Sequence, residues 1–139
     1  MDDLIQLDSI TEPIILEIIK QRYSQNIIYT YIGPMVISVN PFSKLDHYGE
    51  HQIPSYAQNP RDMLIPHIYS VAQETLKKIE GGSSQSVVIS GESGSGKTEA
   101  TKIILKFICE VSGKNNDAAL SLTKSILATN PILEAFGNA

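Results

Sequence analysis

The chain has 139 residues, of which 42% are hydrophobic, so it is long enough for one ordinary domain with a hydrophobic core. Its formal net charge of −4 provides no long-range attraction for nucleic acid or an anionic membrane surface, and its single cysteine excludes an internal disulfide framework. The N-terminus lacks a signal-peptide pattern and no apolar run approaches the ~20 residues of a membrane span, so we expect a cytoplasmic protein with no membrane segment and no nucleic-acid partner.

The first part of the chain predicts one helix, two strands and a long connection. Residues 11–23 place isoleucines at helical spacing, with Pro13 in the first turn, where its missing N–H is tolerated. Residues 27–32 and 34–40 are rich in β-branched and aromatic side chains and predict two strands separated by Gly33. Residues 40–60 are rich in Pro, Gly, Asn and Asp, so we expect a long irregular connection, and such loops tend to be functional.

The rest of the chain predicts helices that alternate with a buried strand. Apolar residues keep helical spacing from about residue 61 to residue 79, and the Gly-Gly pair after Glu80 ends that helix. The segment SVVIS, residues 86–90, predicts a short buried strand, and residues 97–111 predict a strong helix. A polar loop at 112–117 and another helix from residue 118 follow. This alternation favours an α/β fold with a largely parallel sheet.

The segment GESGSGKT fits the phosphate-loop pattern G-x-x-x-x-G-K-[ST] at every fixed position. A strand is predicted before it and a helix after it, as this kind of loop requires. Its glycines can adopt backbone angles that a side chain would forbid, so that successive N–H groups turn inward around an anion. We therefore predict phosphate contacts from the eight residues Gly91, Glu92, Ser93, Gly94, Ser95, Gly96, Lys97 and Thr98.

Two residues of this phosphate loop have distinct predicted roles. Lys97 would bridge the β- and γ-phosphates of a nucleotide, and the hydroxyl of Thr98 would bind magnesium. The helix that begins near Lys97 adds the partial positive charge of its N-terminus. The alternative is a glycine-rich turn that only connects a strand to a helix.

A second motif, HYGEH at residues 47–51, matches the H-x-x-E-H pattern of inverted zinc peptidases. That chemistry needs a helix to bring both histidines to one face, and a further carboxylate ligand. Gly49 interrupts the motif and Pro54 follows closely, so solvated loop histidines are the favoured interpretation.

Three blocks in this order resemble the N-terminal part of a myosin motor domain: YTYIGPMVISVNPF at 29–42, GESGSGKTEATK at 91–102 and NPILEAFGNA at 130–139. The resemblance covers about residues 3–139. It implies that residues 1–139 are the N-terminal part of a single motor domain of the α/β P-loop NTPase type, with an incomplete central sheet and flanking helices. Apolar sheet and helix faces would then be exposed. The ligand implied is ATP with Mg²⁺.

The resemblance also implies a purine-binding segment, residues 40–48, with the sequence NPFSKLDHY. In the family this segment lies along the adenine and ribose, which implies contacts from Asn40, Pro41, Lys44 and Tyr48. An amide can hydrogen-bond a purine edge, and a tyrosine ring can cover its face. The alternatives are a solvated loop lysine at Lys44, and loop-stabilising roles for Asn40 and Tyr48.

Two further residues are candidates for positions near the nucleotide. Glu99 follows the phosphate loop as in myosins, and the alternative is an interaction with the helix N-terminal dipole. Asn138 belongs to the block that leads into the first switch loop, and the alternative is a helix-capping role. Residues 112–117 fall where myosins have a variable surface loop.

The switch patterns that position water and stabilise the γ-phosphate in myosins do not occur in this sequence. We therefore expect no complete catalytic set, and binding without turnover by this chain. The resemblance implies an actin-activated ATPase as the parent, actin filaments as its partner and a cytoskeleton-associated location; it does not specify light chains. Two alternatives stay open: a truncated nucleotide-binding fragment, and a non-motor P-loop ATPase or kinase.

Overall fold

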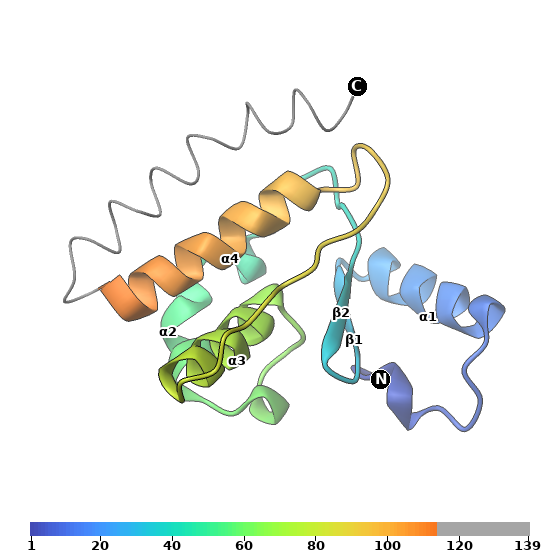
Figure 1. Cartoon of the computed structure of the whole chain (residues 1–139). Helices are drawn as coiled ribbons and strands as arrows, with labels where there is room; N and C mark the ends of the chain where they lie inside the picture. The colour runs from blue at the N-terminus through green and yellow to red at the C-terminus, as the bar shows by residue number, and fades with distance from the viewer. Residues whose placement is uncertain (114–139) are drawn as a thin grey trace. The chain divides into compact units, whose positions relative to one another are not determined.

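The computed structural model describes residues 1–113. The chain divides into two compact units, Met1–Val71 and Ala72–Ala139, and the boundary falls inside helix α3, which Figure 1 labels. In chain order the main elements are α1 (Glu12–Ser24), β1 (Tyr29–Ile32), β2 (Met35–Ser38), α2 (Ile53–Gln58), α3 (Ile68–Glu80) and α4 (Lys97–Ser112). Within residues 1–113, four short 3-10 helices accompany them: η1 (Leu4–Gln6), η2 (Asp46–Tyr48), η3 (Glu50–Gln52) and η4 (Arg61–Met63).

The two predicted strands form an antiparallel hairpin, with pairs running from Tyr29 opposite Ser38 to Ile32 opposite Met35. The turn has Gly33 at its first central position with φ of 58°, a backbone angle that suits glycine and matches the twist of a hairpin. One parallel bridge, between Asp3 and Tyr31, adds the N-terminal segment beside β1. The expected largely parallel sheet is not found in residues 1–113, where the one sheet is this hairpin.

A buried arginine, Arg22, joins α1 to the hairpin and to the N-terminal segment. Its side chain donates to Thr30 Oγ1 at 2.8 Å, to the Tyr29 carbonyl at 2.9 Å and to Asp2 Oδ1 at 2.9 Å. A further bond goes to the Met1 carbonyl. Arg22 is 7% exposed, and a buried charge of this kind is tolerated only when it is paired and hydrogen-bonded. The planar guanidinium bonds both β1 and the N-terminal segment because its five donors point in different directions.

The connection between β2 and α3 is more regular than its composition predicts. It contains η2, η3 and α2, and helix α2 contributes the buried side chains of Ile53 and Tyr56. The next α-helix begins at Ile68 rather than near residue 61, and the chain immediately before it includes the buried Pro66. A residue before a proline is biased away from helical angles, which explains why the helical spacing of 61–67 produces only the short η4 and no α-helix.

In the second unit, α3 ends at Glu80 and a turn with Gly82 at φ of 92° follows, as expected. The predicted strand at 86–90 is wrong, because no strand is assigned there and Val88 is 89% exposed. A strand needs a hydrogen-bonded neighbour, and residues 1–113 supply none for this segment. Exposure of apolar side chains is confirmed here and on α1, where Leu16 is 68% exposed. None of the helices within residues 1–113 has the length and apolar character to cross a membrane.

An aromatic cluster forms the core of the first unit around His67, which is 1% exposed. The imidazole stacks on the Tyr69 ring with centroids 3.9 Å apart, and it also contacts Tyr29, Tyr48 and Tyr56. Burial among these rings disfavours the charged imidazolium and lowers the pKa of His67 to about 4. The same desolvation raises the pKa of Tyr29 and of Tyr56. The histidine is therefore neutral at pH 7.

The substitution Arg22→Lys is expected to reduce the free energy of unfolding by about 2 kcal/mol, because an ammonium cannot serve Thr30, Tyr29 and the N-terminal segment together. Urea unfolding followed by circular dichroism measures this change. Gln21→Ala, on the exposed side of the same helix, is the matched control and should change stability by less than about 0.5 kcal/mol. Equal effects of the two substitutions would contradict the role of the guanidinium.

Stability should fall as the pH is lowered from about 6.5 towards 4, because the unfolded chain takes up a proton on His67 before the folded protein does. Above pH 6.5 this contribution is fully present, and it amounts to about 3 kcal/mol if the full shift is realised. Urea unfolding at pH 7 and pH 4.5 should show a smaller pH dependence in His67→Gln than in the unsubstituted chain. His51→Gln, at an exposed site, should retain the original pH dependence.

Candidate functional site

The phosphate loop lies at the N-terminus of α4, as its sequence predicts. Gly94 and Gly96 have φ of 79° and 100°, in the left-handed region that glycine adopts without strain. Gly96 is the N-cap residue directly before α4, and its carbonyl accepts a hydrogen bond from the Ala100 N–H at 2.9 Å. The backbone angles expected for these two glycines are therefore confirmed.

Gly91 is needed for a different reason from the one predicted. Its φ does not lie in the left-handed region. A Cβ at this position would instead lie 2.5 Å from Ser95 Oγ and 3.3 Å from Ser95 Cβ. A side chain at Gly91 would therefore require Ser95 to shift, and the Ser95 N–H donates to the Glu92 carbonyl at 3.1 Å across this turn.

The side chain of Lys97 turns back over the loop. Its Nζ donates to the Gly91 carbonyl at 2.6 Å and to the Glu92 carbonyl at 3.1 Å. These bonds hold the ammonium against the carbonyls of the loop that precedes α4. An ammonium has three donors, so a phosphate oxygen can be bound in addition to the loop carbonyls, or in exchange for one of them.

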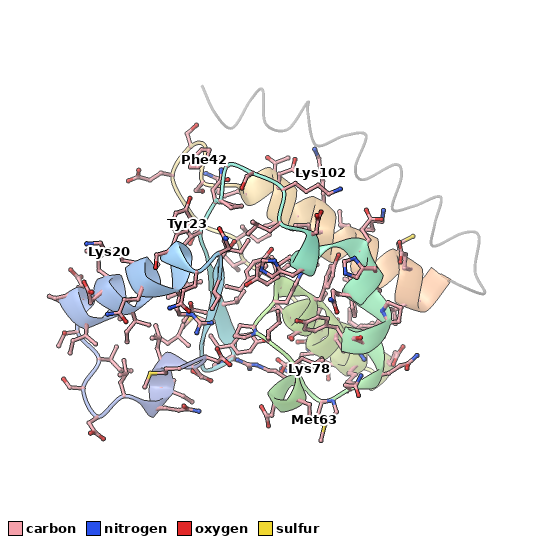
Figure 2. The ribbon with its side chains drawn as sticks, turned by 180° about the vertical axis from the view of Figure 1, so that it is seen from behind. Lys20, Tyr23, Phe42, Met63, Lys78 and Lys102 are labelled. Carbon is pink, nitrogen blue, oxygen red and sulfur yellow. The ribbon has the colours of Figure 1, made fainter. Side chains whose placement is uncertain are left out.

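Thr98 and Glu99 occupy the first turn of α4. Thr98 is half-buried and Glu99 is exposed. The carboxylate of Glu99 accepts a bond from Lys102 Nζ at 3.2 Å, one turn further along the helix (Figure 2 labels Lys102). An acidic residue in a first turn also interacts favourably with the helix dipole, which is the alternative role predicted for Glu99.

The donor set fits a hydrated magnesium ion better than a metal held by protein alone. No group of three or more His, Cys, Asp or Glu side chains suited to a metal occurs within residues 1–113. Magnesium in phosphate sites usually keeps several waters and takes few protein ligands, so one hydroxyl such as that of Thr98 together with phosphate oxygens is a suitable set.

The purine-binding segment begins with a turn closed by its own asparagine. Asn40 Oδ1 accepts the Phe42 N–H at 2.8 Å, while the Asn40 carbonyl accepts the Tyr23 hydroxyl at 3.4 Å. Pro41 is half-buried and Lys44 is exposed. The turn gives Asn40 a loop-stabilising contact, as its alternative interpretation predicts, and its proposed contact with a base stays a prediction.

Phe42 was not singled out by the sequence patterns. It is 83% exposed and has φ of 52°, an uncommon angle for a large side chain, and Figure 2 labels it on the connection that follows β2. Asn40, two residues earlier, is the feature of the sequence that could have indicated this turn. An asparagine side chain can accept a hydrogen bond from the backbone N–H two residues further along, which closes such a turn.

Tyr48, at the other end of the segment, is held by the core of the first unit. Its hydroxyl accepts the Ile28 N–H at 3.3 Å, and its ring meets the Tyr29 ring edge-on with centroids 5.0 Å apart. Burial raises the pKa of the Tyr48 hydroxyl, although the bond from Ile28 opposes this effect. These contacts support a loop-stabilising role, and covering of a base by this ring stays a prediction.

The candidate residues fall into two groups that the structure describes separately. Asn40, Pro41, Lys44 and Tyr48 belong to the first unit, and the phosphate loop with Glu99 belongs to the second. Asn138, the variable loop beyond residue 113, the helix predicted from residue 118 and the block at 130–139 lie outside the described residues.

The zinc-peptidase pattern does not form a metal site. His47 lies in η2 and His51 in η3, with Gly49 between these short helices, so the two histidines do not share one helical face. His47 Nε2 contacts the Asn26 carbonyl at 3.1 Å. The favoured interpretation of exposed loop histidines agrees with their positions.

Comparison with known proteins agrees with the resemblance of the three sequence blocks. The family model described as the myosin head (motor domain) matches residues 1–139. The chain is 42% identical over 140 residues to the myosin IA heavy chain of Dictyostelium discoideum, an alignment that covers 100% of this chain and 14% of that protein. It is 46% identical over 141 residues to the myosin ID heavy chain of the same organism, with 100% and 13% covered.

A third relative, Myosin-4 of Saccharomyces cerevisiae, is 44% identical over 144 residues, with 99% of this chain and 10% of that protein covered. The chain thus spans between 10% and 14% of the length of these three relatives. The match extends over every block that suggested the family, from the hairpin to the last ten residues. The chain belongs to the myosin motor-domain family.

Proposed function

We propose that this chain binds MgATP, with the phosphate loop at Gly91–Thr98 holding the triphosphate. The observation that carries the proposal is the loop geometry: two left-handed glycines, a glycine that permits a close turn, and Lys97 folded over the loop at the N-terminus of α4. Backbone N–H groups at a helix N-terminus suit an anion, and α4 is long enough for its dipole to contribute. Membership in a family of nucleotide-dependent motors agrees with this chemistry.

Each residue has a defined task in this proposal. Lys97 exchanges a loop carbonyl for oxygens of the β- and γ-phosphates, and Thr98 contributes its hydroxyl to the magnesium ion. Glu99, which pairs with Lys102, acts on the helix terminus rather than on the nucleotide. Bound magnesium neutralises phosphate charge, while the loop backbone orients the triphosphate.

The purine segment supplies the preference for adenine. Asn40 and Tyr48 are the groups that would meet the base, with Pro41 and Lys44 beside the ribose and phosphates. No N-K-x-D pattern, which reads guanine in other P-loop proteins, occurs in the sequence.

For the whole protein we infer a myosin motor that couples ATP hydrolysis to movement along actin filaments, with a cytoplasmic, cytoskeleton-associated location. This inference extends well beyond the residues described, because the chain spans at most 14% of the length of the relatives named above. The match over residues 1–139 argues against a non-motor ATPase or kinase that shares only the phosphate loop. Within the chain itself the proposal is limited to nucleotide binding.

Lys97→Ala should weaken MgATP binding by at least about tenfold, because it removes charge-assisted hydrogen bonds to the phosphates. Isothermal titration calorimetry of the 139-residue chain measures the change. Lys102→Ala, on the same helix and paired with Glu99, is the matched control and should leave the affinity unchanged. Unchanged affinity in Lys97→Ala would remove this lysine from the site.

MgATP should bind more tightly than MgGTP, by about tenfold if one hydrogen-bonded edge of the base is recognised. Competition between the two nucleotides for the same chain measures this preference. Equal affinities, or a preference for GTP, would exclude base recognition by Asn40 and Tyr48 while leaving the phosphate loop assignment intact.

A further inference from the structure

The purine-binding segment is tied at both ends to the residues that enter β1. At its start, the Val39 N–H donates to the Ile28 carbonyl at 3.0 Å. At its end, the Ile28 N–H donates to the Tyr48 hydroxyl at 3.3 Å, so that one residue of the main chain holds both sides of the loop. His47 adds a contact with the Asn26 carbonyl at 3.1 Å.

The imidazole of His67 makes a further connection to the same end of the segment. Its Nδ1 accepts the Tyr69 N–H at 3.0 Å, in the first turn of α3. Its Nε2 lies 3.1 Å from the Tyr48 carbonyl. A carbonyl oxygen can only accept, so Nε2 must have the proton and Nδ1 must have the lone pair. Both contacts are satisfied by one neutral tautomer of the ring.

The ring has little freedom to adopt another arrangement. It is stacked on Tyr69 with an angle of 14° between the planes, and the Tyr56 ring lies with its centroid 5.2 Å away. Close packing of this kind holds a side chain in a single rotamer. The position of the Tyr48 carbonyl is therefore coupled to the start of α3 through a rigid, buried imidazole.

We propose that His67 is a positioning residue for the purine-binding segment: by holding the Tyr48 carbonyl, the neutral imidazole fixes the loop conformation that accepts the base of the nucleotide. This proposal rests on the proposed function, that is, on MgATP binding by this chain. His67 does not itself touch the nucleotide, and its effect is exerted on the base and not on the triphosphate.

Two substitutions separate the two bonds of the ring. In His67→Gln, the side-chain amide nitrogen takes the place of Nε2 and can still donate to the Tyr48 carbonyl, while the acceptor for Tyr69 is lost. In His67→Asn, the side-chain oxygen takes the place of Nδ1 and caps α3 as asparagines commonly do, while the bond to Tyr48 is lost. The probes are MgATP, and magnesium tripolyphosphate as a triphosphate without a base.

We expect His67→Asn to raise the Kd for MgATP by about threefold to tenfold, the effect of one lost hydrogen bond, with the Kd for tripolyphosphate unchanged. His67→Gln should keep both values near those of the unsubstituted chain. A role in stability alone would weaken both probes equally in each variant, and that result would overturn the proposal. Unchanged MgATP affinity in His67→Asn would also overturn it.

If His67→Asn does not fold, His67→Leu takes its place, because leucine fills a comparable volume and lacks both bonds. Both His67→Leu and His67→Gln lack the acceptor for the Tyr69 N–H, so a comparison of the two isolates the bond to the Tyr48 carbonyl. Equal MgATP affinities of the two variants would overturn the proposal.

If the unsubstituted chain binds neither probe, the proposed function fails instead. The exchange rate of the Ile28 amide hydrogen, which is bonded to the Tyr48 hydroxyl, then tests the positioning role of His67. Faster exchange in His67→Asn than in the unsubstituted chain, with no such increase in His67→Gln, supports this role. Equal exchange rates in the two variants overturn it.

Discussion

The first unit depends on the desolvated guanidinium of Arg22. A charge in this position is costly unless it is fully bonded, and the partners of this side chain on α1 come from two places: the N-terminal segment and β1. The folded chain must therefore bring α1, the hairpin and the first two residues together at once. The hairpin leads directly into the purine-binding segment, so the bonds of Arg22 that hold the hairpin also hold the first residue of that segment in place.

The phosphate loop depends on backbone conformation and on one close approach. Gly94 and Gly96 have left-handed φ, which residues with a side chain rarely adopt, although a Cβ at either position would meet nothing within 4 Å. At Gly91 a Cβ would instead come within 2.5 Å of the Ser95 side chain. Lys97 then supplies the positive charge of the loop, and its ammonium is held by the Gly91 and Glu92 carbonyls. In the proposed function, phosphate would therefore be bound largely by the main chain, with Lys97 adding a charge and Thr98 a hydroxyl.

The sequence predicted the elements whose causes are local. The hairpin around Gly33 and the start of α4 at Lys97 follow from turn residues and helical spacing within a few positions. The strand at 86–90 was predicted wrongly, because a strand requires a distant partner that periodicity cannot supply. The place of His67 was missed for a related reason, since its ring contacts come from Tyr29, Tyr48 and Tyr56, far away in the sequence. Its position directly before α3, where capping residues occur, was the available signal.

The left-handed angle of Phe42 has a consequence for which amino acids this position can accept. A β-branched residue such as valine would be disfavoured there by its own backbone, whatever its fit to a ligand, whereas asparagine or glycine would relieve the strain. The exposed phenylalanine ring therefore stands at a backbone angle that favours a small or amide side chain. A change at this position alters two properties at once: the strain of the main chain in this loop and the apolar surface that the ring exposes to solvent.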